Sequence, residues 1–170
     1  MPYTTPKTWA SGDVLTAADL NTYVRDNVAF SANPPKVRVF MSAAVNVATS
    51  TASAPTFDSE RFDTDTMHST TVNTDRITFT TAGTYLIGAN LDWAANGTGS
   101  RSADFLLNGV TVIPGQTYPA NTEAGFSTLQ SPSTLYAFTA GQYATLRVRQ
   151  NSGGAINLNT CEFYAVWVSL

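Results

Sequence analysis

Apolar and polar residues alternate along most of the chain that follows the prolines at 34–35. Successive side chains of a β-strand point to opposite faces, so alternation with a period of two predicts strands with one buried face. Asn-Gly at 108–109, which favours a tight hairpin, is one of the turns between alternating segments. We expect strands at 37–47, 77–79, 84–93, 105–107, 110–113, 135–138, 144–149 and 161–170. Many short, regularly spaced strands predict a mainly β protein, built as a sandwich or barrel.

One segment near the start has the period of a helix instead. Thr16 and Asp19 stand three residues apart, in a capping-box-like start. Four apolar side chains then share one helical face: Leu20, Tyr23, Val24 and Val28. Two prolines follow and cannot continue the hydrogen-bond ladder. We therefore expect a helix at about 17–30 and two parts in the chain, an N-terminal arm and helix at 1–35 and a β domain at 36–170.

The apolar stripe of this helix needs a partner, because an isolated helix of this length is marginal in water. Either the stripe packs on the β domain of the same chain, or it docks on another protein. The preceding stretch favours docking, since it has no periodicity and carries Trp9, a large apolar side chain suited to anchor a contact. The candidate anchor residues are Trp9, Leu20, Tyr23, Val24 and Val28.

The last expected strand, 161–170, is apolar on both faces. One face carries Cys161, Phe163, Ala165 and Trp167, and the other Tyr164, Val166, Val168 and Leu170. A sandwich strand normally exposes one face to water, so the face that does not fill the core needs a further cover. That cover is the leader helix or a neighbouring subunit, and we favour the subunit. The candidate interface residues are Tyr164, Val166 and Val168.

The charge of the chain argues against two classes of partner. Only 12% of the residues are charged, the net charge is −3, and the lysines are Lys7 and Lys36. Nucleic acids and anionic membranes are bound by clustered lysine and arginine, so we expect neither as a partner. No apolar run has the length of a membrane span.

Residues that carry most enzyme chemistry are scarce. His68 is the only histidine and Cys161 the only cysteine, and neither lies in a nucleophile motif. A zinc site needs several Cys or His ligands. We therefore expect no enzyme activity, no catalytic residue and no cofactor, and we expect both residues to be structural.

Four neighbouring acidic residues are the constellation that best suits a metal ion: Asp58, Glu60, Asp63 and Asp65. Closely spaced oxygen ligands on a loop suit calcium, but the spacing differs from that of the helix–loop–helix calcium loop, and Arg61 lies among them. We favour a solvated or salt-bridged loop over a calcium site. A carboxylate pair for glycoside cleavage ranks below both.

The helical leader also carries a resemblance. TTPKTWASGDVLTAADLNTYVRDN, residues 4–27, resembles a leader found on structural proteins of tailed bacteriophages. That leader has a Thr/Pro-rich start, a Trp, a Gly-Asp turn and an Ala-Ala-Asp-Leu-Asn helix ending in Arg-Asp-Asn. The resemblance covers about the first thirty residues and implies attachment to other virion proteins of the capsid or tail.

A second resemblance covers about residues 37–170. FDSERFDTDTMHS, NTDRITFTTAGTYLIGANLDW, GSRSADFLLNG, LYAFTAGQYATLRVRQNSG and CEFYAVWV are similar, in order, to the globular-head jelly roll of complement and the tumour-necrosis-factor-like superfamily. The matching positions are Phe57, Asp58, Phe62, Asp63, Gly83, Tyr85, Arg101, Asn108, Gly109, Gly141, Leu146, Gln150 and Phe163. Gln142 departs from the pattern, which usually has Asp there. The resemblance implies an antiparallel jelly-roll sandwich that assembles as a homotrimer.

Together these features predict a phage virion structural protein, anchored by residues 1–35 and displaying a trimeric jelly-roll knob on the particle surface. Because no shaft, collagen repeat or heptad run separates the two parts, we expect a head decoration protein, a head spike or a short tail appendage rather than a long fibre. The alternative is a receptor-binding adhesin, such as a tail-fibre tip, whose knob recognises a host surface glycan. A polysaccharide-degrading enzyme ranks last.

Overall fold

The computed structural model describes residues 3–117, 125 and 127–170. The chain divides into two compact units, Met1–Pro35 and Lys36–Leu170. We call them the leader unit and the β unit.

The leader unit contains one continuous run of helix. It comprises α1 (Ala17–Asp19), the π-helical turn η1 (Leu20–Arg25) and α2 (Asp26–Ala32). Thr16 is the N-cap of this helix, as predicted. Its hydroxyl oxygen accepts a hydrogen bond from the Asp19 backbone N–H at 3.1 Å. The helix ends slightly beyond its expected end, where Pro34 cannot continue it.

The segment before the helix folds back along it, which the sequence did not predict. Asn27 holds this segment through its side-chain amide: it accepts from the Thr4 N–H at 3.0 Å and donates to the Thr4 carbonyl at 2.7 Å. Tyr3 meets Phe30 edge to face, with the ring centroids 6.0 Å apart. Phe30 is the buried residue of the helix. The leader unit is therefore a helix with an ordered arm.

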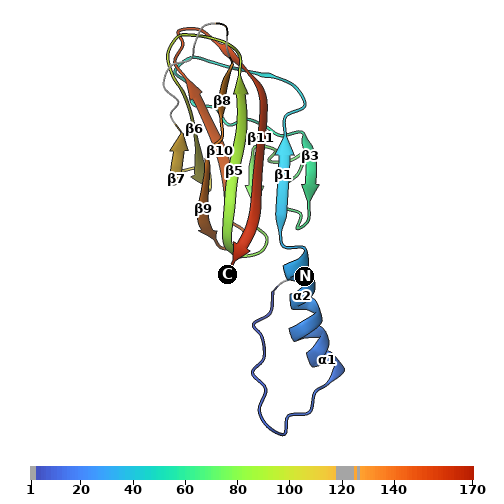
Figure 1. Ribbon diagram of the computed structural model, residues 1–170. Helices are drawn as coiled ribbons and strands as arrows, with labels where there is room; N and C mark the ends of the chain where they lie inside the picture. Colours follow the sequence, from blue (N-terminus) through green and yellow to red (C-terminus); the bar gives the residue numbers. More distant parts are fainter. Residues whose placement is uncertain (1–2, 118–124, 126) are drawn as a thin grey trace. The chain divides into compact units, whose positions relative to one another are not determined.

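The β unit consists of two antiparallel sheets (Figure 1). Its strands are β1 (Lys36–Phe40), β2 (Val45–Val47), β3 (Ser59–Asp63), β4 (Arg76–Thr78), β5 (Gly83–Trp93), β6 (Arg101–Leu107), β7 (Thr111–Thr117), β8 (Thr128–Gln130), β9 (Ser133–Phe138), β10 (Tyr143–Gln150) and β11 (Ile156–Ser169). Within the described residues, one sheet has the order β3-β1-β11-β5-β8, with β2 paired to β11 and β9 to β5. The other has the order β4-β10-β6-β7. The predicted mainly β, antiparallel sandwich is confirmed.

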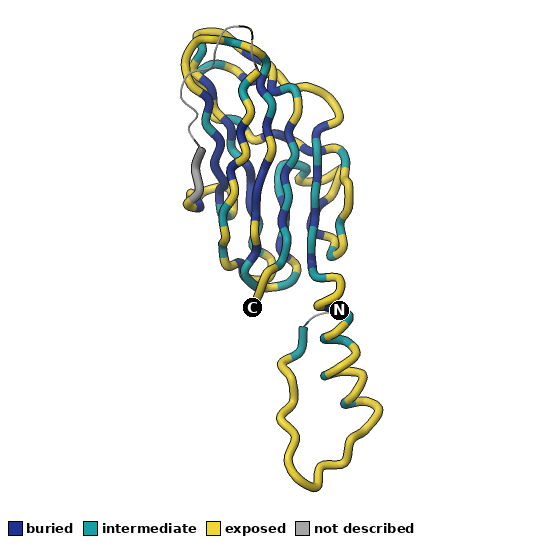
Figure 2. Tube along the Cα trace, in the orientation of Figure 1, coloured by how far each residue is buried: buried dark blue, intermediate teal, exposed yellow. Residues whose placement is uncertain are grey.

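The two sheets enclose an aromatic core. Figure 2 shows the buried residues concentrated along the strands of the β unit. Phe79 stacks on Phe138 with ring centroids 3.6 Å apart, and Phe105 stacks on Phe163 at 5.6 Å. The buried members of this cluster all lie between positions 37 and 165, so the β unit has a complete core of its own.

Several boundary predictions are wrong. β6 and β11 begin earlier than expected, β7 extends further, and β8 was not expected. The single strand expected at 37–47 is two strands, β1 and β2, which pair with different parts of β11. Between them the Ser42 N–H donates to the Asp58 side chain at 2.9 Å instead of to a neighbouring strand, so the ladder is interrupted. The acidic segment expected to be a loop contains β3, which pairs with β1. The side chains of β3 do not alternate between buried and exposed, so the sequence there lacks the period of two by which the other strands were predicted.

Candidate functional site

The two faces of β11 have different surroundings. Cys161, Phe163 and Ala165 are buried in the core, at 1%, 0% and 0% exposure. Tyr164 and Val166 therefore point to the outer face of the seven-stranded sheet, where they are half-buried. The structure thus places the candidate interface residues on the face opposite the core.

The outer face carries further apolar residues on the neighbouring strands. Val166 pairs with Leu86 of β5, and Leu86 pairs with Leu135 of β9. Leu86 is 37% exposed, Leu135 59% and Val168, at a β-bulge of β11, 52%. We call Leu86, Leu135, Tyr164, Val166 and Val168 the outer-sheet patch. A contiguous exposed patch of this kind is typical of a protein–protein contact.

Because Gly88 has no side chain, the Tyr164 side chain of the outer-sheet patch can lie flat against β5. Tyr164 is the cross-strand partner of Gly88, and a Cβ added at Gly88 would lie 2.2 Å from the Tyr164 hydroxyl oxygen. The tyrosine side chain therefore occupies the space above the glycine. The absent side chain at Gly88 was not recognised from the sequence as part of this surface.

A charged cluster borders the outer-sheet patch. Glu162 accepts hydrogen bonds from Arg38 Nε and Arg61 Nε, both at 2.7 Å, and the Arg61 guanidinium lies 4.6 Å from the centre of the Phe40 ring. Burial raises the pKa of Glu162, but the hydrogen bonds and charges of Arg61 and Arg38 outweigh it and hold the pKa below its usual value. The ionised carboxylate therefore stabilises the folded β unit.

We expect Glu162→Gln to lower the free energy of unfolding by about 1–2 kcal/mol near neutral pH. Because the folded-state pKa is lowered, this contribution is present above the unfolded value of about 4.5 and is lost as the pH falls through the lower folded value. Urea unfolding of the wild type and the variant, at neutral pH and well below pH 4.5, measures the difference. An equal loss at both pH values would contradict the expectation.

The helix stripe of the leader unit is exposed. Leu20, Val24 and Val28 are 43%, 49% and 62% exposed. Val24 and Val28 line a shallow pocket together with Tyr23 and Tyr3. Tyr23, the fourth residue of the predicted stripe, is half-buried in this pocket.

Trp9 lies outside that pocket and is 38% exposed. The Lys7 ammonium is 4.3 Å from the centre of the Trp9 ring and 3.3 Å from the Asp19 carboxylate. Lys7 therefore links the ring to the start of the helix. None of the helices in the described residues is long and apolar enough to cross a membrane.

The candidate acidic residues are held by separate partners. Asp58 accepts hydrogen bonds from the Ser42 hydroxyl and N–H, which hold the pKa of this carboxyl below its usual value. Asp65 accepts from the Thr81 hydroxyl at 2.8 Å. In the described part of the chain, no group of three or more His, Cys, Asp and Glu side chains is arranged to hold a metal ion.

Asp63 and Glu60 of β3 each contact the segment that follows this strand. One oxygen of Asp63 accepts from the Met67 and His68 backbone N–H groups at 2.6 and 2.9 Å. Glu60 lies 2.9 Å from Nδ1 of the buried His68 ring. These contacts stabilise the turn after β3. Burial of Cys161 raises the pKa of its thiol, which disfavours the reactive thiolate.

A groove on the other sheet was missed by the sequence analysis. Two adjoining hollows of about 290 and 280 Å³ share Ala52 and Arg147. Arg149 lines one hollow and Arg76 the other. We call this the arginine groove. Arg147 and Arg149 alternate with apolar residues of β10, and this alternation was the available sequence signal.

Solved structures share the architecture of the β unit. The globular domain of zebrafish complement 1qA protein matches with a TM-score of 0.59 at 12% identity, over 79% of this chain and 97% of that one. Murine APRIL, solved at pH 5.0, matches with a TM-score of 0.59 at 9% identity, over 78% and 98%. The β unit is a jelly roll of this kind. No protein-family model matches the chain, and no curated protein is similar to it in sequence.

The matching positions of the second resemblance include core residues of this jelly roll. Phe57, Tyr85, Leu146 and Phe163 are 0% exposed. Arg101 is also buried; its guanidinium donates to the carbonyls of two loop residues, and burial lowers its pKa. At these identities the matches establish the fold of the β unit.

Proposed function

We propose that the chain is a structural protein of a tailed-bacteriophage particle, attached by the leader unit and displaying the β unit as a homotrimeric knob on the particle surface. The observation that carries the attachment is the exposed stripe of Leu20, Val24 and Val28. An amphipathic helix that presents its apolar face to solvent is suited to bind a groove of another protein. The resemblance of the leader to phage leaders supports a capsid or tail protein as that partner.

The leader unit is organised to present this stripe. The arm is hydrogen-bonded to the helix through Asn27, and Thr16 caps the helix. The leader unit therefore loses less conformational freedom on docking than a disordered peptide would lose. Sedimentation of particles with the full chain, and with the chain lacking residues 1–35, tests the attachment.

The outer-sheet patch supports the homotrimer. Its apolar residues lie on three neighbouring strands, and the Glu162 cluster beside them supplies polar groups for the rim of an interface. The resemblance to the complement and tumour-necrosis-factor-like jelly rolls supports three as the number of subunits.

We expect light scattering after size exclusion to give three times the chain mass of 18.1 kDa. The measurement is made at several protein concentrations, since an assembly held by a patch of this kind dissociates on dilution. A mass of one chain at all concentrations would contradict the homotrimer. It would not test the attachment, which the sedimentation experiment measures separately.

The proposed role requires no enzyme activity, metal or cofactor. His68 and Cys161 are buried and serve the fold. The four acidic residues of the β3 region are occupied by structural hydrogen bonds.

A further inference from the structure

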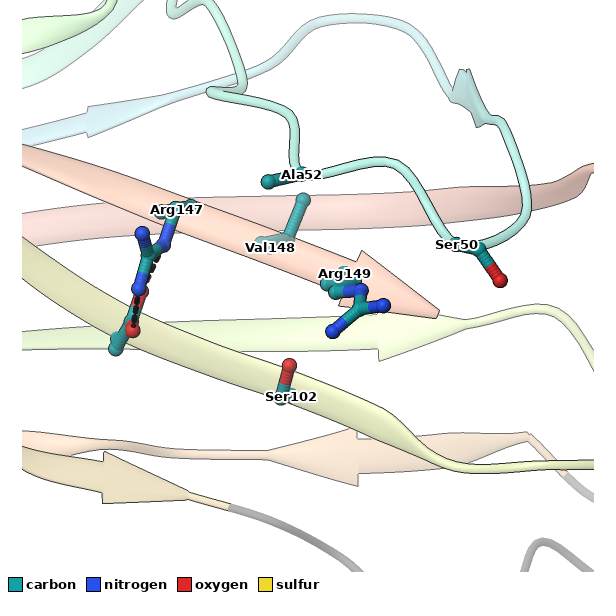
Figure 3. Close-up of a pocket in the computed structure, with 7 residues that line it drawn as sticks. Ser50, Ala52, Ser102, Arg147, Val148 and Arg149 are labelled. Carbon is teal, nitrogen blue, oxygen red and sulfur yellow. Dashed lines mark hydrogen bonds and ion pairs between the residues drawn. The ribbon is translucent and has the colours of Figure 1, made fainter. Parts of the chain in front are cut away.

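The arginine groove brings guanidinium groups of two strands to one surface. Arg147 and Arg149 are alternate residues of β10, and β4, which carries Arg76, is paired with β10. Figure 3 shows Arg147 and Arg149 along the same strand, with Ser102 of the adjacent β6 beside them. Ser53 pairs with Val148 through backbone hydrogen bonds, which holds the segment 50–54 beside this strand as a wall of the groove.

Only one of these three guanidinium groups has a carboxylate partner in the described part of the chain. Arg147 binds Asp104 with two parallel hydrogen bonds, one of them 2.8 Å long from Nε. Arg149 and Arg76 have no hydrogen-bond acceptor among the described residues. Arginine donors that face a hollow without an acceptor are suited to bind an anion from solution.

The Arg76 side chain is held in place by an aromatic ring. Its guanidinium lies 4.3 Å from the centre of the Tyr143 ring, which fixes its plane. Its Nε is buried and has no hydrogen-bond partner among the described residues. An unpaired buried N–H is costly, so an acceptor supplied by a ligand would relieve that cost, directly or through an ordered water.

The charge of the groove selects the kind of anion. Its lining carries three guanidinium groups and the carboxylates of Asp75 and Asp104, which leaves one excess positive charge in a protein of net charge −3. One excess charge matches a monoanion such as a carboxylate better than a phosphate dianion.

The remaining lining is polar and suited to hydroxyl groups. Ser50 and Ser102 lie in the hollow of Arg149, and Asn73 and Thr145 in the hollow of Arg76. These side chains donate and accept hydrogen bonds, as the hydroxyl groups of a sugar require. We infer that the arginine groove binds an oligosaccharide that carries a carboxylate group. This site lies on a different sheet from the outer-sheet patch and does not depend on the attachment or the homotrimer.

We expect 3′-sialyllactose, a trisaccharide with one carboxylate, to bind the full chain and to shift the backbone amide NMR signals of 147–149. Arg149→Gln should weaken binding by about tenfold or more, as expected for loss of a charge-assisted hydrogen bond. Arg149→Lys keeps the charge but loses the paired N–H donors, so its affinity should be intermediate. Arg25→Gln makes the same charge change on the leader unit, where Arg25 pairs with Asp26, and should bind like the wild type.

Two further ligands test the chemical class. The methyl ester of the same trisaccharide has no charge and should bind about tenfold more weakly or worse. Inorganic phosphate should bind more weakly than 3′-sialyllactose. Equal binding of the ester, tighter binding of phosphate, or an Arg149→Gln variant that binds like the wild type would each overturn the inference. Light scattering of each variant verifies that the assembly is unchanged.

Discussion

Val166→Asp is expected to separate the subunits and leave each β unit folded. Val166 lies on the outer face of β11, half-buried in the single chain, between Lys36 of β1 and Leu86 of β5. In a single chain the new carboxylate reaches water and the adjacent lysine. In the proposed homotrimer it would be buried in an apolar contact, where an unpaired charge costs several kcal/mol. The same loss would occur in every subunit of the proposed trimer, so light scattering should give the mass of one chain.

The neighbouring residue provides the matched control. Ala165 is 0% exposed and points into the core, so Ala165→Asp places the same charge inside the sandwich. That variant should lose the cooperative unfolding transition seen by circular dichroism, whereas Val166→Asp should keep it. If Val166→Asp remains trimeric, the outer-sheet patch is not the interface; if it unfolds, the assignment of the two faces fails.

Removal of residues 1–35 is expected to abolish attachment to particles while leaving a folded trimer. The buried cluster of the β unit lies between positions 37 and 165, so its melting temperature should change little. In sedimentation with particles assembled without the chain, the full protein should appear in the pellet and the truncated protein in the supernatant.

Point variants separate docking from folding of the leader unit. Trp9→Ala should weaken attachment by about 2 kcal/mol or more per subunit if the ring fills a pocket of the partner. In the proposed trimer three leaders would act together, so the loss of avidity should exceed the loss at one site. Leu20→Asp and Val24→Asp act on exposed positions and should weaken attachment as well. A truncated chain that melts much earlier, together with a Trp9→Ala variant that still attaches, would instead support a helix that packs on its own β unit.

The leader unit shows which features local sequence patterns can predict and which they cannot. The helix and its Thr16 cap followed from spacing, because both depend on residues close together in sequence. The return of the arm along the helix did not, since it depends on the pairing of Thr4 with Asn27 across a bend that no local preference specifies.

The β unit divides in the same way. Alternation by itself indicated the long strands β5 and β10 and the second part of β11, and hence a β sandwich, because period two is a property of the strand backbone. It also separated the residues of β11 into two sets, with Phe163 in one and Val166 in the other. Which set fills the core was decided by the tertiary structure, because both sets are apolar and only the position of the second sheet distinguishes them.

The meeting of Arg76 with the arginines of β10 required the tertiary structure. Arg76 and Arg149 are far apart in the sequence, and each by itself is an ordinary polar residue of a strand. Pairing of β4 with β10 brings them to one surface, and the bridge from Ser53 to Val148 adds the wall. Sequence determined which residues alternate; the long-range pairing of strands, set by burial of the common core, decided which of them meet.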